Sequence, residues 1–351
     1  MQQQAGDTER EQKMKLCVIS GDGIGREVVP QAVRVLHRLL PALQIVTADA
    51  GWDTFRQQGT ALPAATLAAA RDCGAVLFGA VSSPAYPVAG YRSPIVQLRR
   101  ELGCHANVRP TLSLPGSGAA EGIDLLIVRE NTEDLYVGEE HSDGDTATAI
   151  KRITRAASRR VAETAFRLAQ DGGRRRVTIV HKANIMPLTD GLFRDAARDV
   201  AAAYPQIAVD ELLVDTAALK LAQASQGFDV LLAPNLYGDI LSDLAAAFGG
   251  GLGVAASLNL GAQAAIAEPV HGSAPDIAGR GIANPVAALL SLALLLRHWW
   301  AQPTLAASLE QAVRRTLADG IATPDLGGDA STAAFCDAVL ARLDPDRLDL
   351  D

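Results

Sequence analysis

The sequence predicts an α/β protein whose short, buried strands pair largely in parallel and alternate with helices. Three features support this prediction. Short apolar runs recur along the chain, helical or loop patterns separate them, and the composition of 48% apolar and 21% charged residues is typical of a globular protein. A chain of 351 residues is too long for one small core, so we expect two domains or one large α/β unit.

The first predicted unit is a strand followed by a glycine turn and a helix. Residues 15–20 form an apolar strand, a Gly-Asp-Gly-Ile-Gly segment interrupts it at 21–25, and apolar residues continue at helical spacing from 28 to 40. The longest apolar run, 286–296, is well short of the ~20 residues of a membrane span and predicts a buried helix. Further strands are predicted at 75–78, 123–128, 177–180 and 228–232.

Charge and cysteine content exclude several classes of protein. The chain has 32 Lys and Arg against 40 Asp and Glu, which argues against a nucleic-acid partner. Four cysteines lie far apart without a C-x-x-C pair, so we expect a reducing, cytoplasmic compartment and neither a zinc knuckle nor a disulfide framework. The polar residues 1–13 lack the apolar stretch of a secretory signal and predict a frayed tail, and no membrane partner is expected.

Polar side chains follow three of the predicted strands. In α/β sheets ligands collect beyond the carboxyl ends of the strands, so we expect a site where these side chains converge. The groups concerned are Arg129 after 123–128, His181 and Lys182 after 177–180, and Asn235, Asp239 and Asp243 after 228–232.

Asp239 and Asp243 are candidate metal ligands. They lie four residues apart on one face of a predicted helix, where like charges cost roughly 0.2–0.5 kcal/mol unless a cation lies between them. Oxygen ligands without Cys or His favour Mg²⁺ or Mn²⁺ over zinc, and Asp215 is a candidate third ligand. The alternative is that acidic residues simply favour the first turns of a helix.

Three arginines and two further side chains are candidates for binding and proton transfer. Arg99, Arg109 and Arg129 offer paired donors that would suit a polycarboxylate, although arginines are commonly surface ion-pair partners. Lys182 ends a strand, where burial and a neighbouring cation would favour its neutral amine, and Tyr136 could act with it. The alternatives are a solvated lysine and a packing tyrosine.

Two loops rich in small residues, at 21–25 and 271–277, could bring the backbone close to a ligand or to another segment. The spacing at 21–25 is G-x-G-x-G, not the G-x-G-x-x-G of dinucleotide-binding turns, and indicates only a close approach of the backbone. Residues 271–277 form a second loop that could present backbone N–H groups to phosphate, or be a tight surface turn.

Together these segments resemble the β-decarboxylating dehydrogenase family of isocitrate, 3-isopropylmalate and homoisocitrate dehydrogenases. The resemblance runs from about residue 15 to 330. Six motifs occur in family order, at 21–25, 106–110, 129–133, 181–184, 238–243 and 268–277.

The resemblance implies two α/β domains around a central cleft, in a fold distinct from the Rossmann type. Residues 1–104 with 250–351 would form a discontinuous cofactor-side domain. Residues 105–249 would form the substrate, metal and dimerisation domain, and an arm at about 131–153 would pair with a second subunit. The expected assembly is a homodimer with shared active sites.

It also implies a role for each matching residue. Arg99, Arg109 and Arg129 would hold the malate carboxylates. Tyr136 and Lys182 would be catalytic, with Lys182 donated across the dimer. Mg²⁺ or Mn²⁺ would bind Asp239 and Asp243 of one subunit and Asp215 of the other. The cofactor would contact Asn184, Glu268, His271, Gly272, Ser273, Ala274, Asp276, Ile277 and Asn284.

Cofactor and substrate preferences follow from single positions. Asp276 would accept hydrogen bonds from a free ribose 2′-hydroxyl and repel a 2′-phosphate, which favours NAD. Ser93, six residues before Arg99, occupies the place where isocitrate enzymes touch the distal carboxylate, and a polar Tyr91-Arg92-Ser93 cluster would penalise an isopropyl group. Arg92 has no counterpart in the fungal homoisocitrate pattern.

Oxidative decarboxylation of homoisocitrate to 2-oxoadipate is therefore the expected reaction, in amino-acid biosynthesis. Isocitrate, one methylene shorter, differs by only ~1–3 kcal/mol in such pockets and stays open, with isopropylmalate and tartrate less favoured. The family also contains non-catalytic regulatory subunits. Those typically lack part of the catalytic set, whereas this chain retains Tyr136, Lys182, Asp215, Asp239 and Asp243.

Overall fold

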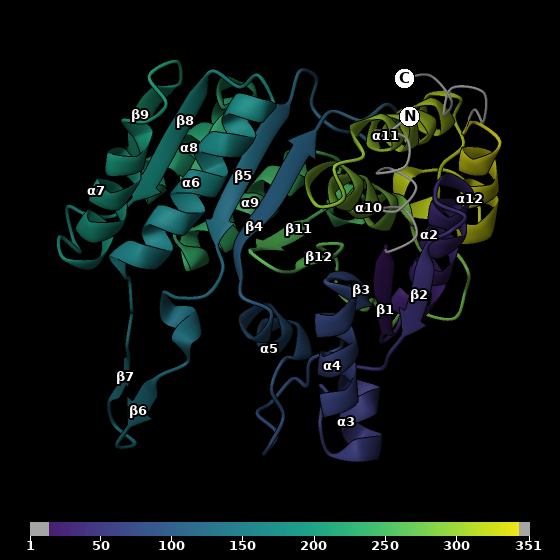
Figure 1. The fold of residues 1–351 in the computed structure, drawn as a ribbon, viewed down its shortest axis with the longest axis horizontal. Helices are drawn as coiled ribbons and strands as arrows, with labels where there is room; N and C mark the ends of the chain where they lie inside the picture. Colours follow the sequence, from purple (N-terminus) through teal and green to yellow (C-terminus); the bar gives the residue numbers. More distant parts are fainter. Residues whose placement is uncertain (1–13, 344–351) are drawn as a thin grey trace, which may run out of the picture.

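A single ten-stranded sheet runs through the protein in the computed structural model, which describes residues 14–343 (Figure 1). The tail predicted at 1–13 lies outside the described residues. In their order across the sheet, the strands are β2 (Gln44–Thr47), β1 (Lys15–Gly21), β3 (Ala75–Ala80), β12 (Ala265–Ala267), β11 (Leu258–Gly261), β4 (Cys104–Leu112), β5 (Asp124–Glu130), β10 (Val230–Ala233), β8 (Arg176–His181) and β9 (Ala208–Leu213).

The sheet is parallel on both sides and antiparallel in the middle. Strands β1, β2, β3 and β12 pair in parallel, as do β5, β10, β8 and β9, whereas β4 runs antiparallel to both β5 and β11, and β11 runs antiparallel to β12. The largely parallel pairing and all five predicted strands are confirmed. The antiparallel centre was missed, because a short connection at 113–123 returns the chain directly from β4 to β5.

Helices cover both faces of the sheet. Alternate residues of β1 enter different cores: Leu16 and Val18 join one, and Cys17 and Ile19 join another, as the period of two in a strand requires. The helices are α2 (Gly25–Leu39), α3 (Trp52–Gln58), α4 (Ala64–Cys73), α5 (Pro94–Glu101), α6 (Arg155–Asp171), α7 (Thr189–Ala201), α8 (Val214–Ala224), α9 (Asn235–Phe248), α10 (Val286–His298), α11 (Pro303–Ala318) and α12 (Thr332–Leu340). Single 3-10 turns are η1 (Leu135–Val137), η2 (Ser225–Gly227), η3 (Leu252–Val254) and η4 (Pro324–Leu326).

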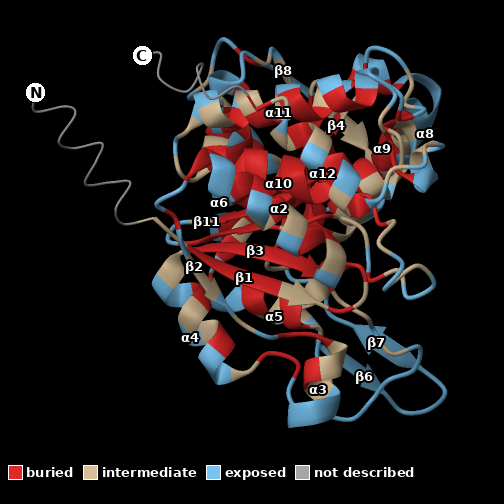
Figure 2. Cartoon of the chain, turned by 90° about the vertical axis from the view of Figure 1, so that its right-hand side faces the viewer, coloured by how far each residue is buried: buried red, intermediate tan, exposed pale blue. Residues whose placement is uncertain are grey.

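The predicted buried helix is α10. Every residue from 286 to 296 is buried, and the helix lies in the centre of the core among α2, α11 and α12 (Figure 2). Across residues 14–343, no helix combines the length and apolar character needed to cross a membrane. All four cysteines are free thiols.

A small hairpin projects away from the body of the protein. Strands β6 (Glu140–Ser142) and β7 (Ala147–Ala149) pair only with each other, and every residue from 138 to 150 is exposed (Figures 1 and 2). An isolated two-stranded hairpin is marginally stable in water. This segment falls inside the predicted arm.

Candidate functional site

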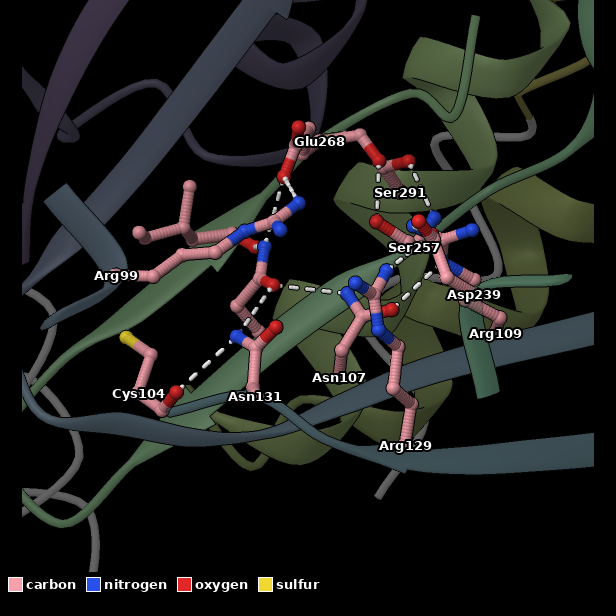
Figure 3. Close-up of polar contacts among 12 residues, drawn as sticks. Arg99, Cys104, Asn107, Arg109, Arg129, Asn131, Asp239, Ser257, Glu268 and Ser291 are labelled. Atoms are coloured by element: carbon pink, nitrogen blue, oxygen red, sulfur yellow. Dashed lines mark hydrogen bonds and ion pairs between the residues drawn. The ribbon is translucent and has the colours of Figure 1, made fainter. Parts of the chain in front are cut away.

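Asp239 is the point at which three of the predicted side chains meet. Arg109 on β4 and Arg129 on β5 both form ion pairs with its carboxylate, at 3.3 Å for Arg109, and the Tyr136 hydroxyl donates to it at 2.5 Å. Arg109 also reaches Asp243, one helical turn further along α9, at 3.2 Å (Figure 3 shows Asp239 with the two arginines). Of the side chains expected to converge after the strands, Arg129 and Asp239 therefore meet in one chain, and Arg109 and Tyr136 join them.

Strand register and one glycine explain this convergence. In the antiparallel pairing of β4 with β5, Asn107 lies opposite Arg129, and Arg109 projects from the same face as Asn107 because strand side chains alternate. Helix α9 passes close above: a Cβ atom at Gly238 would lie 2.6 Å from Cγ of Arg129. The glycine before Asp239 therefore makes room for the buried guanidinium.

The electrostatics of this cluster depend on burial and on the arginines. Burial, the largest influence, lowers the pKa of Arg129 to about 10, with help from the charge of Arg109. For Asp239 burial acts in the opposite direction, but the charges of Arg129 and Arg109 prevail and hold its pKa below the ordinary value. Burial raises the pKa of Tyr136, and so does its hydrogen bond to Asp239, so the phenol keeps its proton at neutral pH.

A network of buried asparagines connects the third arginine. Arg99 pairs with Glu268 at 2.7 Å, and Asn259 donates to the same carboxylate oxygen at 3.0 Å. Asn107 donates to Asn259 at 2.8 Å and accepts from Arg109 at 2.6 Å. A continuous path of polar contacts therefore runs from Arg99 to Tyr136, and Figure 3 shows its part from Arg99 to Asp239.

Sequence reasoning missed Asn107 and Asn259 in this network. Asn131 also donates to Asn259, at 3.1 Å, and the side-chain oxygen of Asn235, a residue expected at the site, accepts two hydrogen bonds from Arg129. The available signal was a polar residue inside an apolar strand, as with Asn259 between Leu258 and Leu260. Buried amides of this kind require partners, which makes them markers of a built polar centre.

Lys182 and Asp215 form a separate pair. Lys182 follows β8, and its ammonium donates to the Asp215 carboxylate, at the start of α8, at 2.5 Å. This hydrogen bond is the largest cause of a lowered pKa at Asp215. Within one chain, the charged group that lies next to the Lys182 ammonium is thus the Asp215 carboxylate. The prediction that a cation lies next to Lys182 is wrong. Within residues 14–343, no three His, Cys, Asp or Glu side chains gather as metal ligands.

The two glycine-containing loops pack against each other. The Ile24 amide donates to the Ser273 carbonyl at 2.9 Å, and a Cβ atom at Gly23 would lie only 2.1 Å from that carbonyl oxygen. The Ser82 and Ser273 hydroxyls are 2.7 Å apart. The predicted close backbone approach at 21–25 is confirmed, and its partner is the loop at 271–277.

This second loop keeps groups that a ligand could use. The Nε2 atom of His271 is buried and finds no hydrogen-bond partner within residues 14–343, and burial lowers the pKa of its ring. Asp276 is exposed. The remaining predicted cofactor residues differ in position: Glu268 faces Arg99, Asn284 donates to Asp325, and Asn184 is exposed in the loop after β8.

The segment before α5 differs in part from expectation. The Tyr91 ring packs edge-on against Trp52 and Phe55, and its hydroxyl donates to the Ser82 carbonyl at 3.1 Å. Tyr91 is therefore a packing residue and not part of a free polar cluster. Ser93 precedes α5, and its hydroxyl makes no capping hydrogen bond to that helix.

The fold defines the class of the protein. A mixed ten-stranded sheet of this topology is that of the β-decarboxylating hydroxyacid dehydrogenases, and the chain is an enzyme of that class. It belongs to the isocitrate/isopropylmalate dehydrogenase family, whose profile matches residues 15–339. The predicted family and fold are confirmed.

Named relatives cover almost the whole chain. An isocitrate/homoisocitrate dehydrogenase of Thermus thermophilus is 49% identical over 94% of this chain and 98% of its own length. A 3-isopropylmalate dehydrogenase of Archaeoglobus fulgidus is 47% identical over 94% of this chain and 99% of its own length. The crystal structure of isocitrate dehydrogenase from Methylococcus capsulatus superposes with a TM-score of 0.89 at 43% identity, covering 94% of this chain and 99% of that one.

Family members act on small hydroxyacids and use a divalent metal ion and NAD(P). The side chains in this chain fit both groups. Asp239 and Asp243 present hard oxygen donors along one side of α9, and the His271 Nε2 atom, which has no partner among residues 14–343, offers a polar contact in the loop at 271–277.

Proposed function

We propose that the protein catalyses the NAD- and Mg²⁺- or Mn²⁺-dependent oxidative decarboxylation of a 3-substituted malate, homoisocitrate, to 2-oxoadipate. The proposal is carried by the continuous polar path from Arg99 through Arg109 to Tyr136. Three buried guanidiniums in one network favour the binding of anions, and a substrate with several carboxylates supplies them.

The proposal includes two domains and a homodimer. Residues 1–104 with 250–351 form the cofactor side, and 105–249 form the substrate and metal side with its arm at 131–153. The exposed hairpin of β6 and β7 supports a partner for the arm. Large apolar side chains are exposed near Lys182, Asp215 and Asp239 in the sequence, which supports a second subunit over these segments; they are Ile185, Leu188, Leu219 and Ile240. Four free thiols suit a cytoplasmic setting.

In the proposed complex, Arg99, Arg109 and Arg129 bind the malate carboxylates, and Ser93 binds the distal one. Arg109 and Arg129 would exchange their present contact with Asp239 for the substrate. Asp239 and Asp243, with Asp215 of the second copy, hold the metal ion. The nicotinamide cofactor is assigned to Asn184, Glu268, His271, Gly272, Ser273, Ala274, Asp276, Ile277 and Asn284.

The bound groups supply a hydride acceptor and a Lewis acid for the developing negative charge. Lys182, which must first give up a proton to become a neutral amine, assists removal of the proton of the substrate hydroxyl as hydride leaves the same carbon. The bond to the 3-carboxylate then breaks and releases CO₂. Tyr136, whose raised pKa keeps the phenol protonated, returns a proton to carbon 3 of the resulting enolate.

The Ser93 hydroxyl makes no capping hydrogen bond to α5, and this supports a third carboxylate over an isopropyl group, because an isopropyl group bound against it would leave the hydroxyl without a partner. Isocitrate remains the first alternative substrate, and isopropylmalate and tartrate follow.

The test is NADH formation by the purified chain alone, with Mg²⁺ and each of homoisocitrate, isocitrate, isopropylmalate and tartrate. We expect the highest kcat/KM with homoisocitrate. A higher value with another acid would replace the substrate, and no turnover with any of them would favour a regulatory subunit. The Ser93→Ala variant is the matched control, since it should weaken the tricarboxylates without weakening isopropylmalate.

A further inference from the structure

A buried ion cluster lies outside the proposed substrate contacts. The Lys151 ammonium pairs with Asp190 at 2.7 Å and with Asp134 at 3.5 Å. Both aspartates are fully buried, and Lys151 is largely buried with its ammonium 4.4 Å from the centre of the Tyr237 ring. Two inaccessible carboxylates therefore depend on one cation.

Each aspartate uses its second oxygen for a backbone amide of the candidate site. Asp190, on α7, accepts from the Lys182 amide at 2.7 Å. Asp134, just before Tyr136, accepts from the Leu236 amide in the first turn of α9 at 2.8 Å. The Tyr237 ring, which also contacts Lys151, belongs to the same turn. Lys151 thus contacts two separate elements through one aspartate each.

We propose that Lys151 is a positioning residue that fixes the Lys182 backbone relative to the first turn of α9. This inference rests on the proposed function for the roles of Lys182 and Asp239. In the proposed dimer, Lys182 serves the site of the second copy, whereas Asp239 and Tyr136 serve the chain's own site. Each chain thus contributes Lys182 to its partner's site and Asp239 and Tyr136 to its own site, and Lys151 connects these two contributions.

Charge explains why a cation is needed at this position. Burial opposes the charge on Lys151, but the hydrogen bond to Asp190 and the charge of Asp134 outweigh it, and the pKa of Lys151 is raised. Without the ammonium, two carboxylates that are both fully buried would repel each other with little screening by solvent. Their separation would relieve the repulsion and would move Lys182 away from α9.

The first test is Lys151→Met, with Arg155→Met as control. Arg155 follows Lys151 by four residues, but it pairs with Asp199 on the exposed surface. We expect Lys151→Met to lower kcat by about 100-fold while KM for the hydroxyacid changes by less than about threefold, since displacement by about 1 Å costs that much. Hydrogen exchange in segments 182–190 and 235–243 should accelerate by at least about tenfold. Wild-type kcat, or unchanged exchange in both segments, would overturn the inference.

A second variant covers the case in which Lys151→Met does not fold. Asp190→Asn keeps an oxygen for the Lys182 amide but removes the charge that holds Lys151. We expect faster hydrogen exchange than in the wild type in 182–190, little change in 235–243, and a lower kcat. Hydrogen exchange in 182–190 equal to that of the wild type would refute the positioning role of Lys151. If the wild-type protein oxidises none of the four acids, the proposed function fails, whereas the exchange measurements still decide whether Lys151 fixes these two segments.

Discussion

The Tyr136 hydroxyl donates a hydrogen bond to the Asp239 carboxylate, and the same carboxylate pairs with Arg109 and Arg129. Asp239 therefore links a candidate proton donor to two candidate carboxylate receptors. The Arg129 guanidinium also lies 5.0 Å from the centre of the Tyr136 ring, which restricts the ring further.

Removing the phenol oxygen should affect catalysis and not folding. We expect Tyr136→Phe to lower kcat by about 10²–10⁴-fold, because general acid catalysis contributes that much. The half-buried ring keeps its packing, so the thermal unfolding midpoint should stay close to that of the wild type. Steady-state rates with saturating acid, NAD and Mg²⁺ provide the measurement, and a wild-type kcat would remove Tyr136 from the mechanism.

Mixing two inactive variants tests the shared site. Lys182→Met and Asp239→Asn should each be inactive as homodimers. After joint refolding, half of the dimers are mixed and hold one intact site, so about a quarter of the wild-type activity should return. No recovery in verified mixed dimers would mean that each chain owns a complete site. Joint refolding of Lys182→Met with Asp215→Asn is the control, because both residues would serve the same donated half-site.

Gly238→Ala should damage the site through packing. Its Cβ would lie 2.6 Å from Cγ and 2.7 Å from Cβ of Arg129, and the Cβ atom cannot move without the strand. We expect a loss of about 1–3 kcal/mol in the free energy of unfolding and a raised KM for the acid. Gly191→Ala on α7 is the control, since nothing lies within 4 Å of its added carbon. Urea unfolding with both variants checks the difference, and equal stabilities would contradict it.

Asp276→Asn should weaken the discrimination between the two nicotinamide cofactors. The exposed carboxylate would repel a 2′-phosphate, so we expect kcat/KM with NADP to rise by about tenfold, equivalent to about 1.4 kcal/mol. Asp171→Asn, at the end of α6, changes the net charge equally and should not alter the ratio. An unchanged NAD to NADP ratio in Asp276→Asn would reject the assignment of this loop.

His298 should make the protein sensitive to mild acid. Burial, reinforced by the charges of Arg297 and Arg167, lowers its pKa from 6.5 to about 4. Between pH 6.5 and 4 the folded state binds fewer protons at His298 than the unfolded state does. The contribution of His298 to the free energy of unfolding is therefore fully present above pH 6.5 and is lost as the pH falls towards 4, by up to about 3 kcal/mol. His298→Gln should lose less stability than the wild type between pH 7 and 4.5 in urea unfolding. Equal losses would contradict the assignment.

Local pattern was sufficient for much of the fold. The apolar runs at 75–78 and 177–180 predict strands that β3 and β8 contain, and the run at 286–296 predicts the buried α10. The antiparallel strands β11 and β4 were not predicted. Their residues include Asn259 and Asn107, polar side chains that interrupt the apolar pattern because they belong to the buried network.

The individual candidate residues followed similarly from type and spacing, but their contacts did not. Spacing puts Asp239 and Asp243 on one face of a helix, yet it says nothing of Arg109, which lies more than a hundred residues earlier. Lys151 gave no signal at all, since a single lysine in a polar segment is usually solvated.

From the amino-acid order alone came the class of fold, the family and the identity of the polar groups, because periodicity and motif spacing are properties of neighbouring residues. Which groups meet was decided by tertiary structure. The register of β4 on β5, the approach of α9 at Gly238 and the cation between Asp134 and Asp190 are contacts between distant segments, and their energies depend on burial that forms only when the chain folds.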